Sequence, residues 1–403
     1  MTETTHTLVI GGGQAGVATS AHLQKQGVPH LVLERDRIAE RWRTWRWDSL
    51  VANGPAWHDR FPEAEFEGID PEAFAGKEAV ADYFVRFAGD RNLPIRTGVE
   101  VTKLERNGDA FRATTPHGTI EARNVVVATG PFQKPVIPTV ISDPAITQLH
   151  SNSYRNPKAL PLGAVLVVGA GSSGAQIAEE LVRAGRRVYL SLGPHDRPPR
   201  RYRGKDFVWW LGKLGKWDMK APTPGTEHIT IAVSGAYGGH TMDFRRLANL
   251  GVTLLGRAGD FREGILHFAD DLGRNIKAGD ANYLSVLDEA DAYARAQGLD
   301  LPEEPEARNL LPLPECVTHP TLALDLHQAG IATVIWATGF RLDFGWIDLD
   351  IFRADGRPRH QDGVTEVPGL YFVGLPWLSC RGSAFIWGAW KDAGRLAKVI
   401  AAR

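Results

Sequence analysis

Cysteine is scarce in this sequence, and its two copies are not arranged as a functional pair. Cys316 and Cys380 are the only cysteines in the 403-residue chain, and they form no C-x-x-C motif. A disulfide framework needs more cysteines, and a redox-active dithiol needs two that lie close together. The composition therefore excludes a disulfide-stapled fold, disfavours a disulfide reductase, and fits a reduced, cytoplasmic setting.

The chain also lacks an excess of charge and any long apolar run. Lys and Arg number 46 and Asp and Glu number 47, so no overall field attracts nucleic acid or anionic lipid. No apolar run approaches the ~18 residues of a membrane span, and Met1 to Thr7 are polar rather than signal-like. No metal-ligand cluster is visible. We expect a folded, soluble protein of about two domains that binds no metal and no nucleic acid and crosses no membrane.

The first readable unit is a strand, a glycine-rich turn, a helix and a second strand. The apolar strand Leu8 to Ile10 runs into Gly11-Gly12-Gly13-Gln14-Ala15-Gly16, and an Ala-rich helix ends at Gly27. The strand Leu31 to Leu33 follows and ends in Glu34. This length and order predict a βαβ dinucleotide-binding unit.

The same order of elements recurs in the middle of the chain. The strand Val165 to Val168 leads into Gly169-Ala170-Gly171-Ser172-Ser173-Gly174, then a helix to Ala184 and a strand from Val188 to Leu192. A G-x-G-x-x-G match alone is weak in a chain with 43 glycines, but both matches follow an apolar strand and open a helix. In that setting the glycines let the backbone approach a pyrophosphate at the helix N-terminus.

The residues after each turn assign the two nucleotides. Glu34 stands at a strand end after the first turn, where a carboxylate accepts hydrogen bonds from ribose hydroxyls and repels a 2′-phosphate, which suits FAD. After the second turn no acid follows the strand. The next loop carries Arg197, Arg200, Arg201 and Arg203, which suit the 2′-phosphate of NADPH. The alternative for each arginine is a solvated basic loop that binds nothing.

Two similar strand ends and two proline-rich segments set the expected domain order. Ala128-Thr129-Gly130 and Ala337-Thr338-Gly339 each end an apolar strand, and residues 134–138 and 157–163 are rich in proline. Residues 205–320 carry no motif. We expect an α/β fold with two Rossmann-like domains, the NADPH domain being inserted into the FAD domain. The expected boundaries are 1–157 and 331–403 for the FAD domain and 158–330 for the NADPH domain.

Further segments resemble those of one enzyme family. They are Glu40-Arg41-Trp42-Arg43, similar to a Gly-x-Trp segment beside the flavin, the strand Leu370 to Gly374, and His150-Ser151-Asn152-Ser153-Tyr154 before the second turn. With both glycine turns, they resemble the class B flavoprotein monooxygenases, which include flavin-containing and Baeyer–Villiger monooxygenases. The Phe and Gly that precede the histidine in that family are Pro144 and Ile146 here, so the resemblance rests on the combination of motifs.

The resemblance implies a reaction and three candidate catalytic residues. NADPH would reduce FAD, and a C4a-hydroperoxide formed with O2 would oxygenate a soft sulfur or nitrogen of a small organic substrate. Asn53 would donate to the bound oxygen, and His150 and Tyr154 complete the set, although Asn53-Gly54-Pro55 also fits a plain turn and His150 a structural linker. Alternatives are Baeyer–Villiger oxidation of ketones, disfavoured by Tyr154 where those enzymes usually have Trp, a non-monooxygenase FAD/NAD(P)H oxidoreductase, and a nucleotide-sensing module without turnover. A homodimer is left open.

The cofactor-binding residues that we expect combine the two turns with the segments around them. They are Gly11, Gly13, Gln14, Ala15, Gly16, Glu34, Arg35, Arg41, Trp42, Val101, Ala128, Thr129, Gly130, Gly169, Gly171, Ser172, Ser173, Gly174, Arg200, Arg201, Ala337, Thr338, Gly339 and Gly374.

Overall fold

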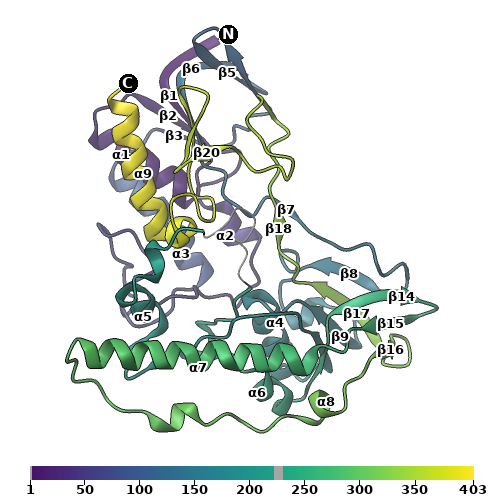
Figure 1. The fold of residues 1–403 in the computed structure, drawn as a ribbon. Helices are drawn as coiled ribbons and strands as arrows, with labels where there is room; N and C mark the ends of the chain where they lie inside the picture. The colour runs from purple at the N-terminus through teal and green to yellow at the C-terminus, as the bar shows by residue number, and fades with distance from the viewer. Residues whose placement is uncertain (1, 222–229) are drawn as a thin grey trace.

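The chain forms two α/β lobes, each built on its own sheet (Figure 1). The computed structural model describes residues 2–221 and 230–403, and the residues between them belong to the region without a sequence motif. Both ends of the chain lie in the first lobe, and the second lobe is made from the middle of the sequence. Within the described ranges, no helix is long and apolar enough to cross a bilayer.

The first lobe has a mixed sheet of ten strands in the described part of the chain. β1 lies between β2 and β6 and is parallel to both, whereas β4 to β6 are antiparallel neighbours. The strands are β1 (Thr2–Ile10), β2 (His30–Leu33), β3 (Ile95–Arg96), β4 (Lys103–Asn107), β5 (Ala110–Thr115), β6 (Gly118–Val127), β19 (Ile347–Asp348), β20 (His360–Gln361), β21 (Val364–Thr365) and β22 (Leu370–Phe372). The helices are α1 (Gln14–Lys25), α2 (Glu40–Thr44), α3 (Lys77–Asp90) and α9 (Ile386–Ala401).

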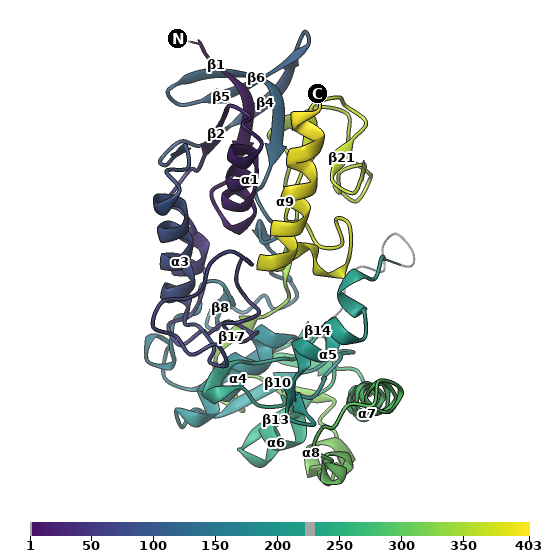
Figure 2. The same ribbon diagram turned by 90° about the vertical axis from the view of Figure 1, so that its left-hand side faces the viewer.

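The C-terminal helix α9 closes this lobe against α1 (Figure 2). Its buried residues recur at helical spacing and join those of α1 and α3 in one apolar core. The strands beneath are apolar on both faces because helices cover one side and β-structure the other, and Val9 and Val126 have no exposed surface. The N-terminal and C-terminal segments are therefore one folding unit.

The second lobe is a parallel sheet in the order β13-β10-β9-β17-β8. Its strands are β8 (Thr147–His150), β9 (Ala164–Val168), β10 (Val188–Ser191), β13 (Val252–Leu255) and β17 (Ile331–Trp336). The helices are α4 (Ser172–Arg183), α5 (Phe207–Lys213), α6 (Phe244–Asn249), α7 (Leu272–Ala296) and α8 (Glu315–Thr318). Small ribbons pair β11 (Arg201–Tyr202) with β12 (Lys205–Asp206), and β15 (Ile265–Phe268) with β14 (Ala258–Arg262) and β16 (Ala323–Asp325). Short 3-10 turns in the described part of the chain are η1 (Pro157–Ala159), η2 (Lys216–Asp218), η3 (Ala236–Gly238), η4 (Pro305–Arg308) and η5 (Arg381–Ala384), the last of which lies beside α9 of the first lobe.

The predicted insertion of one dinucleotide domain into the other is confirmed, but its predicted boundaries are each misplaced by one strand. β8 and β17 pair with each other and lie in the second sheet, so this domain begins before residue 147 and ends after residue 336. The proline-rich segment 157–163 lies inside the second domain, between β8 and β9. The two chain crossings between the lobes pair as β7 (Lys134–Pro135) and β18 (Phe340–Arg341).

Candidate functional site

The first glycine-rich turn joins β1 to α1 and is open on one side. Gly11 has a φ of +112°, and a Cβ there would lie 2.7 Å from the carbonyl oxygen of Ala128. A Cβ on Gly16 would overlap the carbonyl oxygen of Gly11. Gly13, in contrast, would point a Cβ at nothing within 4 Å, and no side chain caps the helix that starts after it. The free N–H groups of α1 thus face a space that an anion can enter.

Glu34 lies directly beside this turn, as the sequence predicts. The Gly12 N–H donates to Oε2 of Glu34 (2.5 Å), and the Asp36 N–H donates to Oε1 (2.9 Å). These bonds fix the carboxylate at the end of β2. Its position fits a ribose-binding acid at the edge of the turn.

Two arginines that follow β2, Arg41 and Arg46, form no ion pair with a described carboxylate. Nη1 of Arg41 is buried without a hydrogen-bond partner among the described residues. Burial and, to a lesser extent, the charge of Arg35 lower the pKa of Arg41 to about 10, while Glu34 acts in the opposite direction. Burial also lowers the pKa of Arg46 to about 10. A desolvated guanidinium with an unpaired nitrogen, as in Arg41, fits a bound pyrophosphate, so this site suits FAD.

The other residues predicted around the flavin have different surroundings. Trp42 packs on the core of the first lobe, and the guanidinium of Arg46 lies 5.7 Å from its ring centroid. Arg35 is exposed and pairs with Asp36 (3.3 Å) and Glu100 (3.9 Å), and Val101 packs against the apolar core beneath β4. Arg35 is thus held by carboxylates just after β2, next to Glu34, whereas Val101 is part of the apolar packing of the first lobe.

Distant segments close the first turn. A Cβ on Gly374 would lie 2.6 Å from the Cβ of Ala15, and the side chain of Gln14 donates to the carbonyl of Ala384 (2.9 Å). After Ala128, the Thr129 hydroxyl and the Gly130 carbonyl both accept from the side chain of Gln133. The C-terminal segment therefore completes a site that the N-terminal segment begins.

The second turn repeats this geometry with the other Ala-Thr-Gly segment. Gly169 has a φ of +133°, and a Cβ there would overlap the carbonyl oxygen of Ala337. Thr338 donates to the carbonyl of Val136. The sequence predicts Ala337 to Gly339 in the third segment of the chain, but Ala337 packs on the second turn because it directly follows β17, the strand beside β9. Each glycine turn is therefore closed by its own Ala-Thr-Gly segment.

A neighbouring segment partly covers the second turn. The backbone and hydroxyl of Ser172 both donate to the carbonyl of Ile231 (2.8 and 2.9 Å), and the Val233 N–H donates to the same hydroxyl (3.2 Å). Gly171 would direct a Cβ toward Thr230, at 3.7 Å. A pyrophosphate at this turn is left with the N–H groups of Ser173 and Gly174. The residues of the second turn fit a second nucleotide, but they leave it less space and fewer free N–H groups than the first turn does.

The loop of arginines is mostly neutralised within the protein. Arg197 pairs with Asp280 (2.6 Å), and Arg203 lies between Asp291 and Glu303. Arg200 is buried and pairs with Asp206, so it does not fit the phosphate-binding role predicted for it. Arg201 alone among the four is exposed; it donates to the backbone carbonyls of Gly238 (3.3 Å) and Gly239 (3.4 Å) and lies over the ring of Phe74 (6.0 Å to its centroid).

The three candidate catalytic residues are not gathered at one point. Nε2 of His150 contacts the Gly339 carbonyl (2.9 Å), and burial lowers the pKa of this histidine. Tyr154 is buried and donates to Glu180 (2.7 Å); burial first, and this bond second, raise its pKa. Both contacts fit structural roles at the start of the second domain. Asn53 is exposed at the contact between the lobes, with Oδ1 accepting from Gln176 of α4 (2.8 Å).

Three residues around these sites were missed from the sequence. Arg46 lies in a segment where Arg and Trp alternate, and this pattern could have identified it from the sequence. Gln176 and Asp206 give no signal, because their roles depend on residues far away in the chain.

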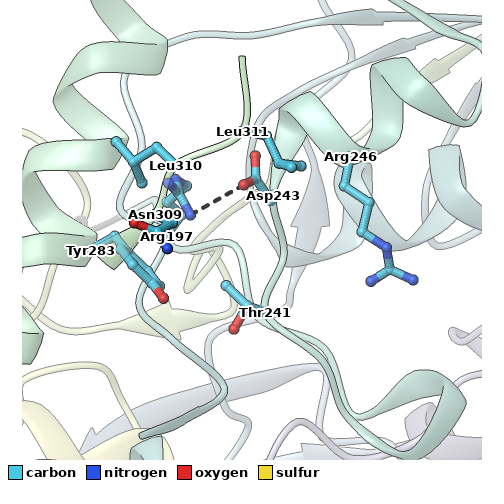
Figure 3. A pocket seen from close by; sticks show the side chains of 8 residues that line it. All are labelled: Arg197, Thr241, Asp243, Arg246, Tyr283, Asn309, Leu310 and Leu311. Atoms are coloured by element: carbon cyan, nitrogen blue, oxygen red, sulfur yellow. Dashed lines mark ion pairs between the residues drawn. The ribbon is translucent and has the colours of Figure 1, made fainter. Parts of the chain in front are cut away.

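A cavity of about 260 Å³ lies elsewhere in the second lobe (Figure 3). Residues of α6, α7 and the 309–311 segment line it, and Arg197 faces Asp243 across it (3.8 Å). Of the loop arginines expected to meet the 2′-phosphate it contains only Arg197, whose charge is paired with Asp243 and Asp280, and it contains no residue of either glycine turn.

Comparison with known proteins agrees with this architecture. A family model described as pyridine nucleotide-disulphide oxidoreductase matches residues 8–210. An uncharacterized CzcO-like oxidoreductase of Geobacillus kaustophilus (strain HTA426) is 35% identical over 96% of this chain and 95% of its own. The probable indole-3-pyruvate monooxygenase YUCCA1 of Arabidopsis thaliana is 30% identical over 45% of this chain and 46% of its own.

Solved structures share the fold across almost the whole chain. A flavin-containing monooxygenase from Stenotrophomonas maltophilia superposes with a TM-score of 0.68 at 19% identity, covering 99% of both chains. The OTEMO protein, solved in complex with FAD and NADP, gives a TM-score of 0.56 at 17% identity, covering 99% of this chain and 85% of that one. These findings support FAD and NADPH, the two cofactors expected from the turns. The chain is an oxidoreductase that belongs to the pyridine nucleotide-disulphide oxidoreductase family, and its relatives confirm the predicted kinship with class B flavoprotein monooxygenases.

Proposed function

We propose that this protein is an NADPH-dependent flavin monooxygenase that transfers one oxygen atom from O2 to a soft sulfur or nitrogen of a small organic substrate. FAD occupies the turn at Gly11 and NADPH the turn at Gly169. When bound, the flavin accepts a hydride from NADPH and activates O2. The observation that carries the proposal is the exposed amide of Asn53 at the contact between the two lobes, each of which has a nucleotide turn, together with the unpaired nitrogen of Arg41 in the first lobe.

The first lobe supplies the groups that hold FAD. The N–H groups at the start of α1 bind the pyrophosphate, where the helix dipole adds about 0.3–1 kcal/mol per favourable contact. Arg41 and Arg46 supply positive charge, and Glu34 accepts hydrogen bonds from the ribose. In the second lobe Ser173 and Gly174 meet the NADPH pyrophosphate, and Arg201 meets the 2′-phosphate.

Asn53 supplies a hydrogen bond to activated oxygen without an acidic proton. A carboxamide donates through Nδ2 but does not release that proton at neutral pH, so it can hold oxygen without discharging hydrogen peroxide. A disulfide reductase of the same family would instead need a pair of cysteines. Cys316 and Cys380 are both free, which also fits the cytoplasmic setting expected from the sequence.

Product analysis under 18O2 tests the proposal. The FAD-loaded protein receives NADPH with a thioether, a tertiary amine or cyclohexanone, and NADPH, oxygenated product and hydrogen peroxide are each quantified. We expect NADPH consumption matched by sulfoxide or N-oxide that carries one 18O atom. Lactone formed from cyclohexanone in preference to both other products would identify the Baeyer–Villiger alternative. Stoichiometric peroxide without any oxygenated product would contradict monooxygenation.

A further inference from the structure

The amide of Asn53 belongs to the first lobe, but a residue of the second lobe sets its direction. Gln176 lies on α4 just after the second turn and is 7% exposed. Its Nε2 donates to Oδ1 of Asn53 (2.8 Å) and to the carbonyl of Val233 (2.7 Å). Both hydrogens of this nitrogen are therefore used.

These two bonds leave Asn53 only one orientation. The carbonyl of Val233 can only accept, so the atom of Gln176 that faces it is the nitrogen. The same nitrogen must then meet the oxygen of Asn53. Nδ2 of Asn53 consequently points away from Gln176, and no acceptor contacts it in the part of the chain that the structure describes.

The backbone of Asn53 is held from the second lobe as well. Nη1 of Arg200 donates to the carbonyl of Asn53 (2.5 Å), and Nη2 pairs with Asp206, whose carboxylate also caps α5 through the Val208 N–H (3.0 Å). Arg200 and Asp206 are both buried. A charge pair so well shielded from water is a rigid support for the carbonyl that it contacts.

We propose that Gln176 and the Arg200–Asp206 pair are positioning residues that fix the Asn53 amide with its N–H groups toward the oxygen-binding side. The inference rests on the proposed function and deepens it, because the second lobe then sets the hydrogen-bond donor of the flavin site as well as binding NADPH. It also gives Arg200 a role that its burial allows.

The sharpest test replaces Gln176 by a residue of the same shape that only accepts. In Gln176→Glu the new carboxylate accepts from Nδ2 of Asn53, so the amide turns over and presents its oxygen instead. Gln176→Leu is the matched control, which removes the donor without adding an acceptor. Arg200→Lys keeps the charge but loses the forked contact to both Asn53 and Asp206, and serves if the glutamate variant does not fold.

The first readout does not need turnover. In protein with 15N-labelled asparagine, the Asn53 side-chain signal, identified by its loss in Asn53→Asp, reports hydrogen exchange at Nδ2. We expect exchange to slow by roughly tenfold or more in Gln176→Glu, and not in Gln176→Leu, because only the former offers an acceptor. Unchanged exchange in Gln176→Glu would overturn the inference whether or not the protein oxygenates any substrate.

The second readout is the share of NADPH electrons that ends in hydrogen peroxide. Loss of one preorganised hydrogen-bond donor lowers the rate of a catalysed step by about 100-fold or more. We therefore expect the share of electrons released as hydrogen peroxide to rise several-fold in Gln176→Glu and Arg200→Lys, while the KM for NADPH stays unchanged. If folded variants released the same share of NADPH electrons as hydrogen peroxide as the wild-type protein does, the positioning role would be overturned. Absence of oxygenated product from the wild-type protein would instead count against the proposed function, leaving the exchange result to decide the orientation.

Discussion

Arg201 differs from the other arginines of its loop because no carboxylate pairs with it among the described residues. Arg201→Ala should therefore raise the KM for NADPH by roughly tenfold while leaving the KM for NADH nearly unchanged, since an arginine–phosphate contact contributes about 1.5–3 kcal/mol. Steady-state kinetics with both nucleotides measure the effect. Arg201→Lys should retain part of the preference as a point charge. Equal losses with NADPH and NADH would show that Arg201 does not recognise the 2′-phosphate.

The same loop shows where single residues escape sequence reasoning. Four arginines close together predict a phosphate site, but the charge of Arg197 is neutralised by Asp280 and that of Arg200 by Asp206. The first of these acids lies on α7, far along the chain, and the second is near in sequence but is buried at the end of β12, where it caps α5. Composition records the charges of a loop, whereas only the fold decides which of them remain available.

At the scale of elements, the two glycine turns are the most predictable feature. Their geometry is local, because Gly16 packs on Gly11 and Gly174 on Gly169, five residues apart in each case, so the spacing alone specifies the contact. The strands that complete each sheet are not local. β8 and β17 pair across the whole second domain, and β8 lies before a proline-rich segment that suggested a boundary. Parallel pairing between distant strands produces no local sequence pattern that identifies the partner of either strand.

The contact of α1 with α9 makes the stability of the first lobe depend on pH. His22 of α1 lies against Trp390 of α9 (4.2 Å between ring centroids), and burial first, then the charge of Lys25, lower its pKa from 6.5 to about 4. Between these values the unfolded chain binds a proton that the folded chain does not, so stability falls as the pH drops from about 6.5 toward 4. One proton changes the free energy of unfolding by at most about 1.4 kcal/mol per pH unit, and by less here because part of the ring is exposed.

Urea unfolding of wild type and His22→Asn at pH 7, 5.5 and 4.5 measures this contribution. Other histidines titrate in both proteins, so only the difference between them reports His22. The asparagine variant should be less stable at pH 7, because it loses packing on Trp390, and the gap should narrow as the pH falls. A gap that is constant across this range would show that His22 takes up its proton equally in both states.

Across the whole molecule, the two lobes are joined by contacts that come from several distant segments. β7 pairs with β18, Gln176 and Arg200 hold Asn53, and Gly235 packs so closely on Ala52 that a Cβ would overlap the carbonyl of Ala52. A nucleotide in the second domain is thereby connected to the residue that we place at the flavin. The two turns are similar in backbone geometry, so their difference in ligand must come from what surrounds them.

Matched substitutions at the two turns can separate their ligands. Gly13 and Gly171 cap α1 and α4 with φ values of −82° and −76°, which any residue adopts, and an added methyl group fits without a protein clash at either position. It would instead meet a pyrophosphate drawn close to the backbone. Gly13→Ala should therefore weaken FAD binding by about tenfold, or 1.4 kcal/mol, and spare NADP+, whereas Gly171→Ala should do the reverse.

Flavin content after purification and calorimetric titration with NADP+ provide the two measurements. Gly76→Ala is the control, because Gly76 also caps a helix at a φ of −66° with nothing within 4 Å, but lies at no predicted nucleotide site. It should change neither affinity. If Gly13→Ala retained FAD at the wild-type level while Gly171→Ala lost it, the two nucleotides would have to be exchanged between the turns, and Glu34 could not be the residue that selects FAD.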